Sequence, residues 1–107
     1  LYLHSFPPRR SSDLSEINIS ANPDEEFFLK IPEQRGMVNE LMKNGIIVSY
    51  ALSFDRTKLW IIFNAENKVE VMTAIDSFPL REYMDFEIFE LMFHENVMTK
   101  LIQFSLN

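Results

Sequence analysis

The chain has 107 residues, a formal net charge of −6 and no cysteine, and hydrophobic residues make up 47% of it. This length allows one small domain with a single core. The acidic balance argues against binding to nucleic acid and to anionic membrane surfaces, and no apolar run reaches the roughly 20 residues that span a bilayer. Without cysteine there is no disulfide, thiol nucleophile or thiolate metal site. We expect a cytoplasmic protein.

The first fourteen residues show neither helical nor strand periodicity. They contain Pro7-Pro8, Arg9-Arg10 and Ser11-Ser12-Asp13, and they resemble a translated sequencing-adaptor read. We therefore predict that residues 1–14 are a non-native, disordered arm and that the domain itself comprises residues 15–94. An ordinary disordered arm is the alternative.

Residues 16–20 alternate polar and apolar side chains, which predicts a half-buried strand. Asn22-Pro23-Asp24 ends this strand and opens a helix whose first turn is acidic. Apolar residues then recur at helical spacing as far as Leu41, but Pro32 interrupts the pattern. Either the helix kinks at Pro32, or a short turn precedes a second helix there. Asn44-Gly45 ends the helical segment.

A hairpin follows. Strand alternation in residues 46–54 predicts one face with Ile46, Val48, Tyr50, Leu52 and Phe54, and another with Ile47, Ser49, Ala51 and Ser53. A polar turn leads to residues 59–63, which are apolar throughout and predict a strand covered on both faces. Asn67, with Glu70 three positions later, indicates the start of a second helix. Pro79 ends that helix, and residues 85–94 predict the last strand.

The order βαββαβ predicts a ferredoxin-like α+β fold, in which a four-stranded antiparallel sheet carries both helices on one face. The strands are apolar on both sides. Burial of apolar surface contributes about 25 cal/mol per Å² to stability, so a sheet face left exposed to water would lose many kcal/mol of this contribution. We therefore predict a homodimer in which two copies stack face to face around a sheltered cavity. The apolar residues among 95–107 predict a tail that docks on a neighbouring subunit.

One stretch carries a more specific signal. Residues 78–94 include Pro79-Leu80-Arg81-Glu82-Tyr83-Met84-Asp85 and resemble the muconolactone Δ-isomerase family, in which a Pro-Leu-x-x-Tyr-Met-Asp segment leads into the last strand. The resemblance extends from about Asn22 to His94. It implies a dimeric α+β barrel, and assemblies of such dimers occur in the family. Members with known activity convert muconolactone to 3-oxoadipate enol-lactone during aromatic degradation, without a metal or redox cofactor.

Such a proton shift needs a base that moves a proton between two carbons, and donors that stabilise the developing charge. We select Glu33 and His94 as candidate catalytic residues, and Arg35, Ser49 and Tyr50 as candidate residues for binding the lactone. Most of them also have a structural interpretation. Glu33 would complement the helix dipole, and Arg35 would form a surface ion pair. Tyr50 would pack in the core, and His94 would cap a strand end. We predict no metal site and no cofactor.

One departure from the family bears on the substrate. Family enzymes carry basic residues on the strand that corresponds to residues 45–54, and this chain has none there. Arg35 or Arg56 would have to bind the lactone carboxylate instead, unless the substrate has changed. Because this scaffold hosts unrelated activities, two alternatives stay open. One is a non-catalytic small-molecule-binding or assembly module, and the other is a different dimeric-barrel enzyme such as a monooxygenase or a dehydratase.

Overall fold

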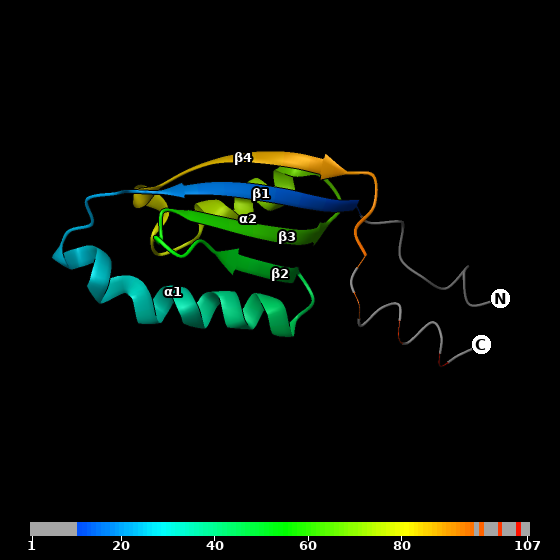
Figure 1. Ribbon diagram of the computed structural model, residues 1–107, viewed down its shortest axis with the longest axis horizontal. Coiled ribbons are helices and arrows are strands. Elements are labelled where there is room, and N and C mark those ends of the chain that lie inside the picture. The colour runs from blue at the N-terminus through cyan, green and yellow to red at the C-terminus, as the bar shows by residue number, and fades with distance from the viewer. Residues whose placement is uncertain (1–10, 96, 98–100, 102–104, 106–107) are drawn as a thin grey trace.

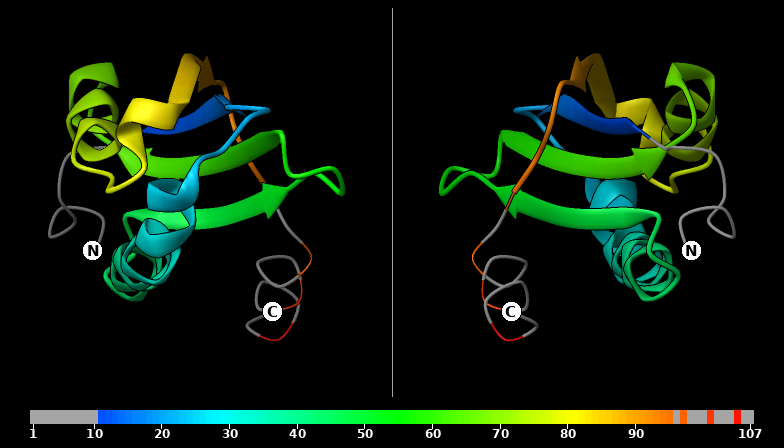
Figure 2. Two further views of the ribbon diagram at one scale, coloured as in Figure 1. Left: turned by 90° about the vertical axis from the view of Figure 1, so that its left-hand side faces the viewer. Right: turned by 90° about the vertical axis from the view of Figure 1, so that its right-hand side faces the viewer.

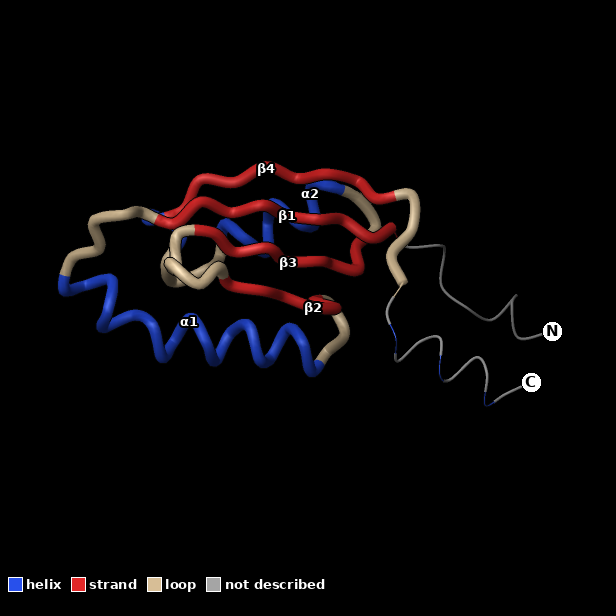
Figure 3. Tube along the Cα trace, viewed as in Figure 1, coloured by secondary structure: helices blue, strands red, loops and turns tan. Residues whose placement is uncertain are grey.

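The structure, a computed structural model, describes residues 11–95 together with residues 97, 101 and 105. The four strands form one antiparallel sheet in the order β2-β3-β1-β4 (Figures 1 and 3). The elements along the chain are β1 (Ser11–Ile19), α1 (Glu25–Lys43), β2 (Ile47–Leu52), β3 (Lys58–Ala65), α2 (Lys68–Asp76), the 3-10 turn η2 (Arg81–Tyr83) and β4 (Met84–Leu91). The predicted ferredoxin-like α+β fold is confirmed.

Both helices lie on the same side of the sheet (Figure 2). α1 packs against β2, and α2 packs against β3 and β4. The core lies between the helices and the sheet, and its most deeply buried apolar side chains are Ile17, Ile47, Ile61, Phe63, Ala65, Val71 and Ile75. Every second residue of β3 is buried on this helix side, whereas Trp60 and Ile62 point to the other side and are only half-buried. In a single chain, β3 is therefore fully covered on one face.

α1 is a single helix that runs through Pro32. It begins at Asp24, whose Oδ1 accepts the backbone N–H of Phe27 at 2.9 Å, and it ends at the predicted Asn44-Gly45, where Gly45 has a φ of +76°. Pro32 lies on the exposed side of the helix, where it removes one intrahelical hydrogen bond without ending the helix. Within the described part of the chain, no helix is long and apolar enough to cross a membrane.

β1 is longer than the strand predicted at residues 16–20. It begins at Ser11, so residues 11–14, which the sequence predicts to be part of a disordered arm, pair within the sheet. β1 is a central strand with β3 on one side and β4 on the other. The two neighbouring strands supply hydrogen bonds to its backbone whatever the side-chain pattern, which explains the extension. Residues 1–10 lie outside the described residues, and the non-native origin of residues 1–14 stays a prediction.

β2 departs from the predicted alternation of faces. Ile47 lies opposite Phe63 but Ser49 lies opposite Ile62, so the strand contains one extra residue at this point. Beyond this bulge, Tyr50 lies opposite the buried Ile61. Ile47 and Tyr50 therefore share the helix side, and the prediction that put Ile47 on the same face as Ser49 is wrong. Strict alternation fails because a bulge adds a residue without changing the partner strand.

Three polar side chains are buried on the helix side: Asp13 and Ser15 of β1, and Gln34 of α1. Asp13 and Ser15 alternate with half-buried residues of β1 and lie on the same face as Ile17. Among the described residues, neither the Ser15 hydroxyl nor the Gln34 side-chain nitrogen has a hydrogen-bond partner. A buried polar group without a partner costs about 1–3 kcal/mol of folding free energy. The Ser15 hydroxyl and the Gln34 side-chain nitrogen therefore lower the stability of the core.

Replacing Ser15 with valine should raise the free energy of unfolding, because it removes the unpartnered hydroxyl. The matched control is Ser15→Thr, since threonine has the shape of valine but keeps a hydroxyl. In urea denaturation, Ser15→Val should exceed Ser15→Thr by about 1–3 kcal/mol. Equal stability of the two variants would show that the hydroxyl finds a partner and would contradict this account.

Candidate functional site

The Pro-Leu-x-x-Tyr-Met-Asp segment forms the junction between the two helices and the sheet. Leu80 is buried, and its backbone N–H donates to Oε1 of Gln34 in α1 at 3.1 Å. Arg81 donates through Nε to Asp76, the last residue of α2, at 2.8 Å, and through a terminal nitrogen to the carbonyl of Met84 at 2.7 Å. These contacts join α1, α2 and the start of β4. The segment that carries the family resemblance thus has a structural task.

Tyr83 completes this junction. Its hydroxyl donates to Oδ1 of Asp24 at 2.8 Å, the same oxygen that caps the start of α1. Its ring packs edge-on against Phe27, with 5.1 Å between the ring centroids. Its backbone carbonyl accepts the N–H of Ser20, just after β1, at 2.9 Å. Tyr83 therefore connects the end of β1, the start of α1 and the start of β4.

Hydrogen bonds shift the pKa values of Tyr83 and of its charged neighbours. The hydrogen bond to Asp24, with smaller effects of burial and of the Asp24 charge, raises the pKa of Tyr83 to about 12. The N–H of Phe27 and the hydroxyl of Tyr83 lower the pKa of Asp24 below its ordinary value. Lys30 Nζ lies 2.9 Å from Glu82 and 3.3 Å from Glu26, and hydrogen bonds to these carboxylates raise the pKa of Lys30.

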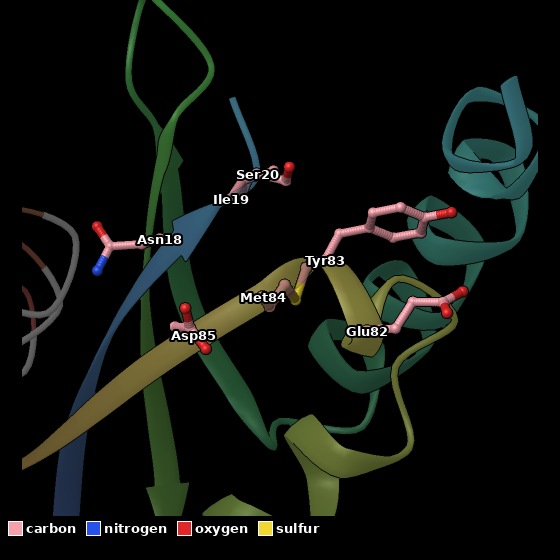
Figure 4. Close-up of a pocket in the computed structure, with 7 residues that line it drawn as sticks. All are labelled: Asn18, Ile19, Ser20, Glu82, Tyr83, Met84 and Asp85. Atoms are coloured by element: carbon pink, nitrogen blue, oxygen red, sulfur yellow. The ribbon is translucent and has the colours of Figure 1, made fainter. Parts of the chain in front are cut away.

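A hollow of about 290 Å³ lies beside this junction. Asn18 points to the opposite side from Tyr83 and Glu82, whose side chains extend toward α1 (Figure 4). The lining residues are Asn18, Ile19, Ser20, Glu82, Tyr83, Met84 and Asp85. Two of them are carboxylates and none is basic. A lactone that carries a carboxylate would be repelled here, so this hollow is a poor site for a muconolactone-like ligand.

The sheet face away from the helices, here called the open face, combines an apolar row with a bound carboxylate. Leu14 lies opposite both Ile62 and Phe89, which makes an apolar row across three strands. In the next row, the indole N–H of Trp60 donates to Oε1 of Glu16 at 3.1 Å. Glu16 is half-buried. The open face thus presents a carboxylate held in place by a donor beside apolar side chains.

Two further charged groups surround this carboxylate. Lys58 Nζ lies 3.9 Å from Oε2 of Glu16. Glu87 of β4 lies directly opposite Glu16, and like charges in this arrangement repel each other. Within the described residues, no three histidine, aspartate or glutamate side chains come together as metal ligands would.

The structure places the predicted site residues on different sides of the molecule. Glu33 and Arg35 are exposed on α1, in the helix layer. Ser49 is half-buried and points to the open face, because it lies opposite Ile62. Tyr50 is on the helix side but 44% exposed, so its reading as a core residue is wrong. Glu33 and Ser49 are therefore separated by the sheet within one chain.

His94 lies beyond β4, which ends at Leu91 rather than at residue 94 as predicted. The side chain of His94 is half-buried. His94 is therefore not part of the strand, and its interpretation as a cap of the strand end stays a prediction. Its proposed role in proton transfer stays a prediction, as do the roles of Glu33, Arg35, Ser49 and Tyr50.

The burial of Gln34 could have been predicted from the sequence. A choice of site residues restricted to ionisable side chains does not include this residue. Gln34 lies in the stripe of positions 27, 31, 34, 38 and 41, whose other members are all apolar. This spacing of four and three residues marks one buried helix face. A glutamine within it predicts a buried amide, which is what the structure has. Glu16 and Trp60 needed the strand register, because they are 44 residues apart.

A family model described as muconolactone delta-isomerase matches residues 16–97, which is most of the chain. This chain belongs to the muconolactone delta-isomerase family. The match includes both helices and three complete strands, together with β1 from Glu16 onward. None of the curated proteins compared with the chain matches it.

The raised pKa of Tyr83 predicts how the stability of this family member depends on alkaline pH. The folded state holds the phenol proton more tightly than the unfolded state, whose ordinary pKa is 10.0. This contribution is complete below pH 10 and is lost as pH rises from 10 toward about 12. The free energy of unfolding of the wild-type protein should therefore fall more steeply in this window than that of Tyr83→Phe.

Asp24→Asn separates the two effects of Asp24, because asparagine still caps α1 and can still accept the hydrogen bond from Tyr83 but lacks the negative charge. Its alkaline profile should therefore lie between those of the wild-type protein and Tyr83→Phe. Identical slopes for the wild-type protein and Tyr83→Phe would show that the hydrogen bond to Asp24 does not form in solution.

Proposed function

We propose that this protein is a cofactor-independent isomerase of the muconolactone Δ-isomerase type. It shifts a proton within a small unsaturated lactone during the degradation of aromatic compounds, in the cytoplasm. The observation that supports this proposal is the family match over residues 16–97. An allylic proton shift is redox-neutral, so a single base and a few donors suffice for it.

The proposal includes a homodimer, alone or as part of a larger assembly of dimers, in which two open faces stack. In a single chain Phe89 is 43% exposed, and Leu14, Trp60 and Ile62 are half-buried. Covering these side chains with a second copy would contribute roughly 25 cal/mol per Å² of apolar surface removed from water. The lactone would then bind between the two sheets, sheltered from solvent.

The two sides of the sheet offer different bases for this reaction. If the ligand binds on the helix side, the base is Glu33, with Arg35 nearby in sequence. If the ligand binds on the open face, the base is Glu16. The Trp60 indole orients the Glu16 carboxylate, and Ser49 lies on a neighbouring part of the same face. Stacking of two open faces would remove Glu16 from bulk water and put it beside the bound lactone, whereas Glu33 is exposed.

The second candidate is a non-catalytic module that binds a small molecule or supports assembly. Two observations favour it. Residues 45–54 lack the basic side chains that family enzymes carry on this strand. The hollow beside Tyr83 is acidic and so does not replace them. A protein of this kind would keep the fold and the dimer but would not turn over muconolactone.

The two candidates are separated by following the ultraviolet absorbance of muconolactone with the full chain and three variants. Loss of the general base should lower kcat by about 10²- to 10⁴-fold. Glu16→Gln should show this loss if the ligand lies on the open face, and Glu33→Gln if it lies on the helix side. Glu40→Gln, at an exposed position of α1, is the control and should keep the wild-type rate.

The absence of turnover in folded wild-type protein would contradict the isomerase and support the binding module. Full activity of both Glu16→Gln and Glu33→Gln would leave the isomerase intact but remove both carboxylates as its base.

A further inference from the structure

We propose that Lys58 binds the carboxylate of the substrate on the open face. This assignment rests on the proposed isomerase and on a ligand that lies on that face. Lys58 would make the site selective for a small lactone that carries a carboxylate. It would take the place of the basic residues that β2 lacks, a task for which the sequence suggested Arg35 or Arg56.

Lys58 is the only basic residue in the four strands as the structure describes them. It lies on the open face, because it alternates with the buried residues of β3 and is two positions from Trp60. It is paired with Asn18 of β1, in the row next to the one that contains Trp60 and Glu16. The strands thus offer a single cation to an anionic ligand, and this cation lies beside the candidate base.

The other basic side chains considered for this task lie elsewhere. Arg35 is exposed on α1, in the helix layer. Arg56 is exposed in the turn between β2 and β3. Arg81 and Lys30 donate hydrogen bonds to carboxylates at the junction of the helices and the sheet. Lys58 is therefore the cation that can meet a ligand next to Glu16.

The ammonium group of Lys58 lies near Glu16 but keeps donors for a ligand. Its Nζ is 3.9 Å from Oε2 of Glu16, which is too long for a hydrogen bond. Its backbone is held by Ser53, whose hydroxyl accepts the Lys58 N–H at 3.0 Å and whose N–H donates to the Lys58 carbonyl at 2.8 Å. An ammonium has three N–H donors on a flexible stem. It can therefore turn to a ligand carboxylate while its Cα stays in place.

The other carboxylates of the open face lie on the far side of β1 from Lys58. Asp85 and Glu87 belong to β4, and β1 separates β4 from β3. Two strand spacings amount to about 10 Å, which exceeds the Debye length of about 8 Å at physiological salt. Lys58 also offsets the charge of Glu16, which an anionic ligand must approach for proton transfer. A ligand carboxylate is therefore attracted to the β3 side of the face.

The order of the rows along β3 matches the polarity of such a ligand. The row of Lys58 is polar, the next row contains Trp60 and Glu16, and the row after that contains Ile62 and Leu14. Alternate residues of a strand are about 7 Å apart. A lactone with its carboxylate at Lys58 and its ring toward Ile62 would therefore place the carbons that exchange the proton beside Glu16.

The test uses a saturated lactone with a carboxymethyl side chain, which has no double bond to shift, and its methyl ester, which lacks the charge. Calorimetry gives the dissociation constants with the full-length protein, and the wild-type protein should bind the acid more tightly than the ester. Lys58→Met should weaken binding of the acid on the order of 10- to 100-fold, because a hydrogen bond between charged groups is lost. It should leave binding of the ester unchanged.

Two further variants complete this comparison. Lys58→Arg keeps the charge and should retain most of the affinity for the acid. Lys68→Met is the matched control, because it removes the same charge at an exposed position of α2 and should bind both lactones as the wild-type protein does. Circular dichroism checks that each variant keeps the fold.

Kinetics with muconolactone separate this assignment from the proposed function. Lys58→Met should raise KM far more than it lowers kcat. A folded wild-type protein that binds the acid through Lys58 without turning over muconolactone would contradict the isomerase and leave the binding site in place. Turnover with unchanged KM and unchanged acid affinity in Lys58→Met would do the reverse. The assignment would also be overturned if the wild-type protein does not bind the acid, or if Lys58→Met weakens binding of acid and ester equally.

Discussion

Both helices of this chain cover the same face of its sheet, and this arrangement follows from how the strands are connected. β1 and β2 are each antiparallel to β3, so they run in the same direction, and the same relation holds for β3 and β4 around β1. α1 and α2 each join two such parallel strands. Connections of this type are almost always right-handed, which puts both helices on one side. The open face is left without cover from either helix, and the proposed dimer and ligand cavity depend on that asymmetry.

The segment that most clearly identifies the family serves the architecture. Tyr83 links the cap of α1 to the end of β1, and Leu80 links Gln34 to the turn after α2. A resemblance carried by these residues is strong for fold, because they define the junction of the elements. It is weaker for chemistry, since the hollow beside them is acidic and would repel the carboxylate of a muconolactone-like ligand.

Periodicity predicted the order of elements, and the turn residues Asn22-Pro23-Asp24 and Asn44-Gly45 predicted the ends of α1. It failed where neighbouring strands decide the outcome: β1 starts at Ser11 because two strands pair with it, and β2 contains a bulge that no single-strand pattern reveals. Ser15 is buried where an apolar residue is expected, and the family match begins only at Glu16. The candidate site was less predictable than the fold, because residue type selected Glu33 whereas the contact of Glu16 with Trp60 depends on strand register.

The cover over the open face can be measured with Trp60, which is the single tryptophan of the chain and lies on that face. Its fluorescence emission and its quenching by acrylamide should be recorded over a wide range of protein concentration. If two open faces stack, Trp60 should emit at short wavelength and be shielded from acrylamide at high concentration, and dilution should reverse both effects. Emission and quenching that stay the same at all concentrations, in a protein that sediments as a monomer, would contradict the account.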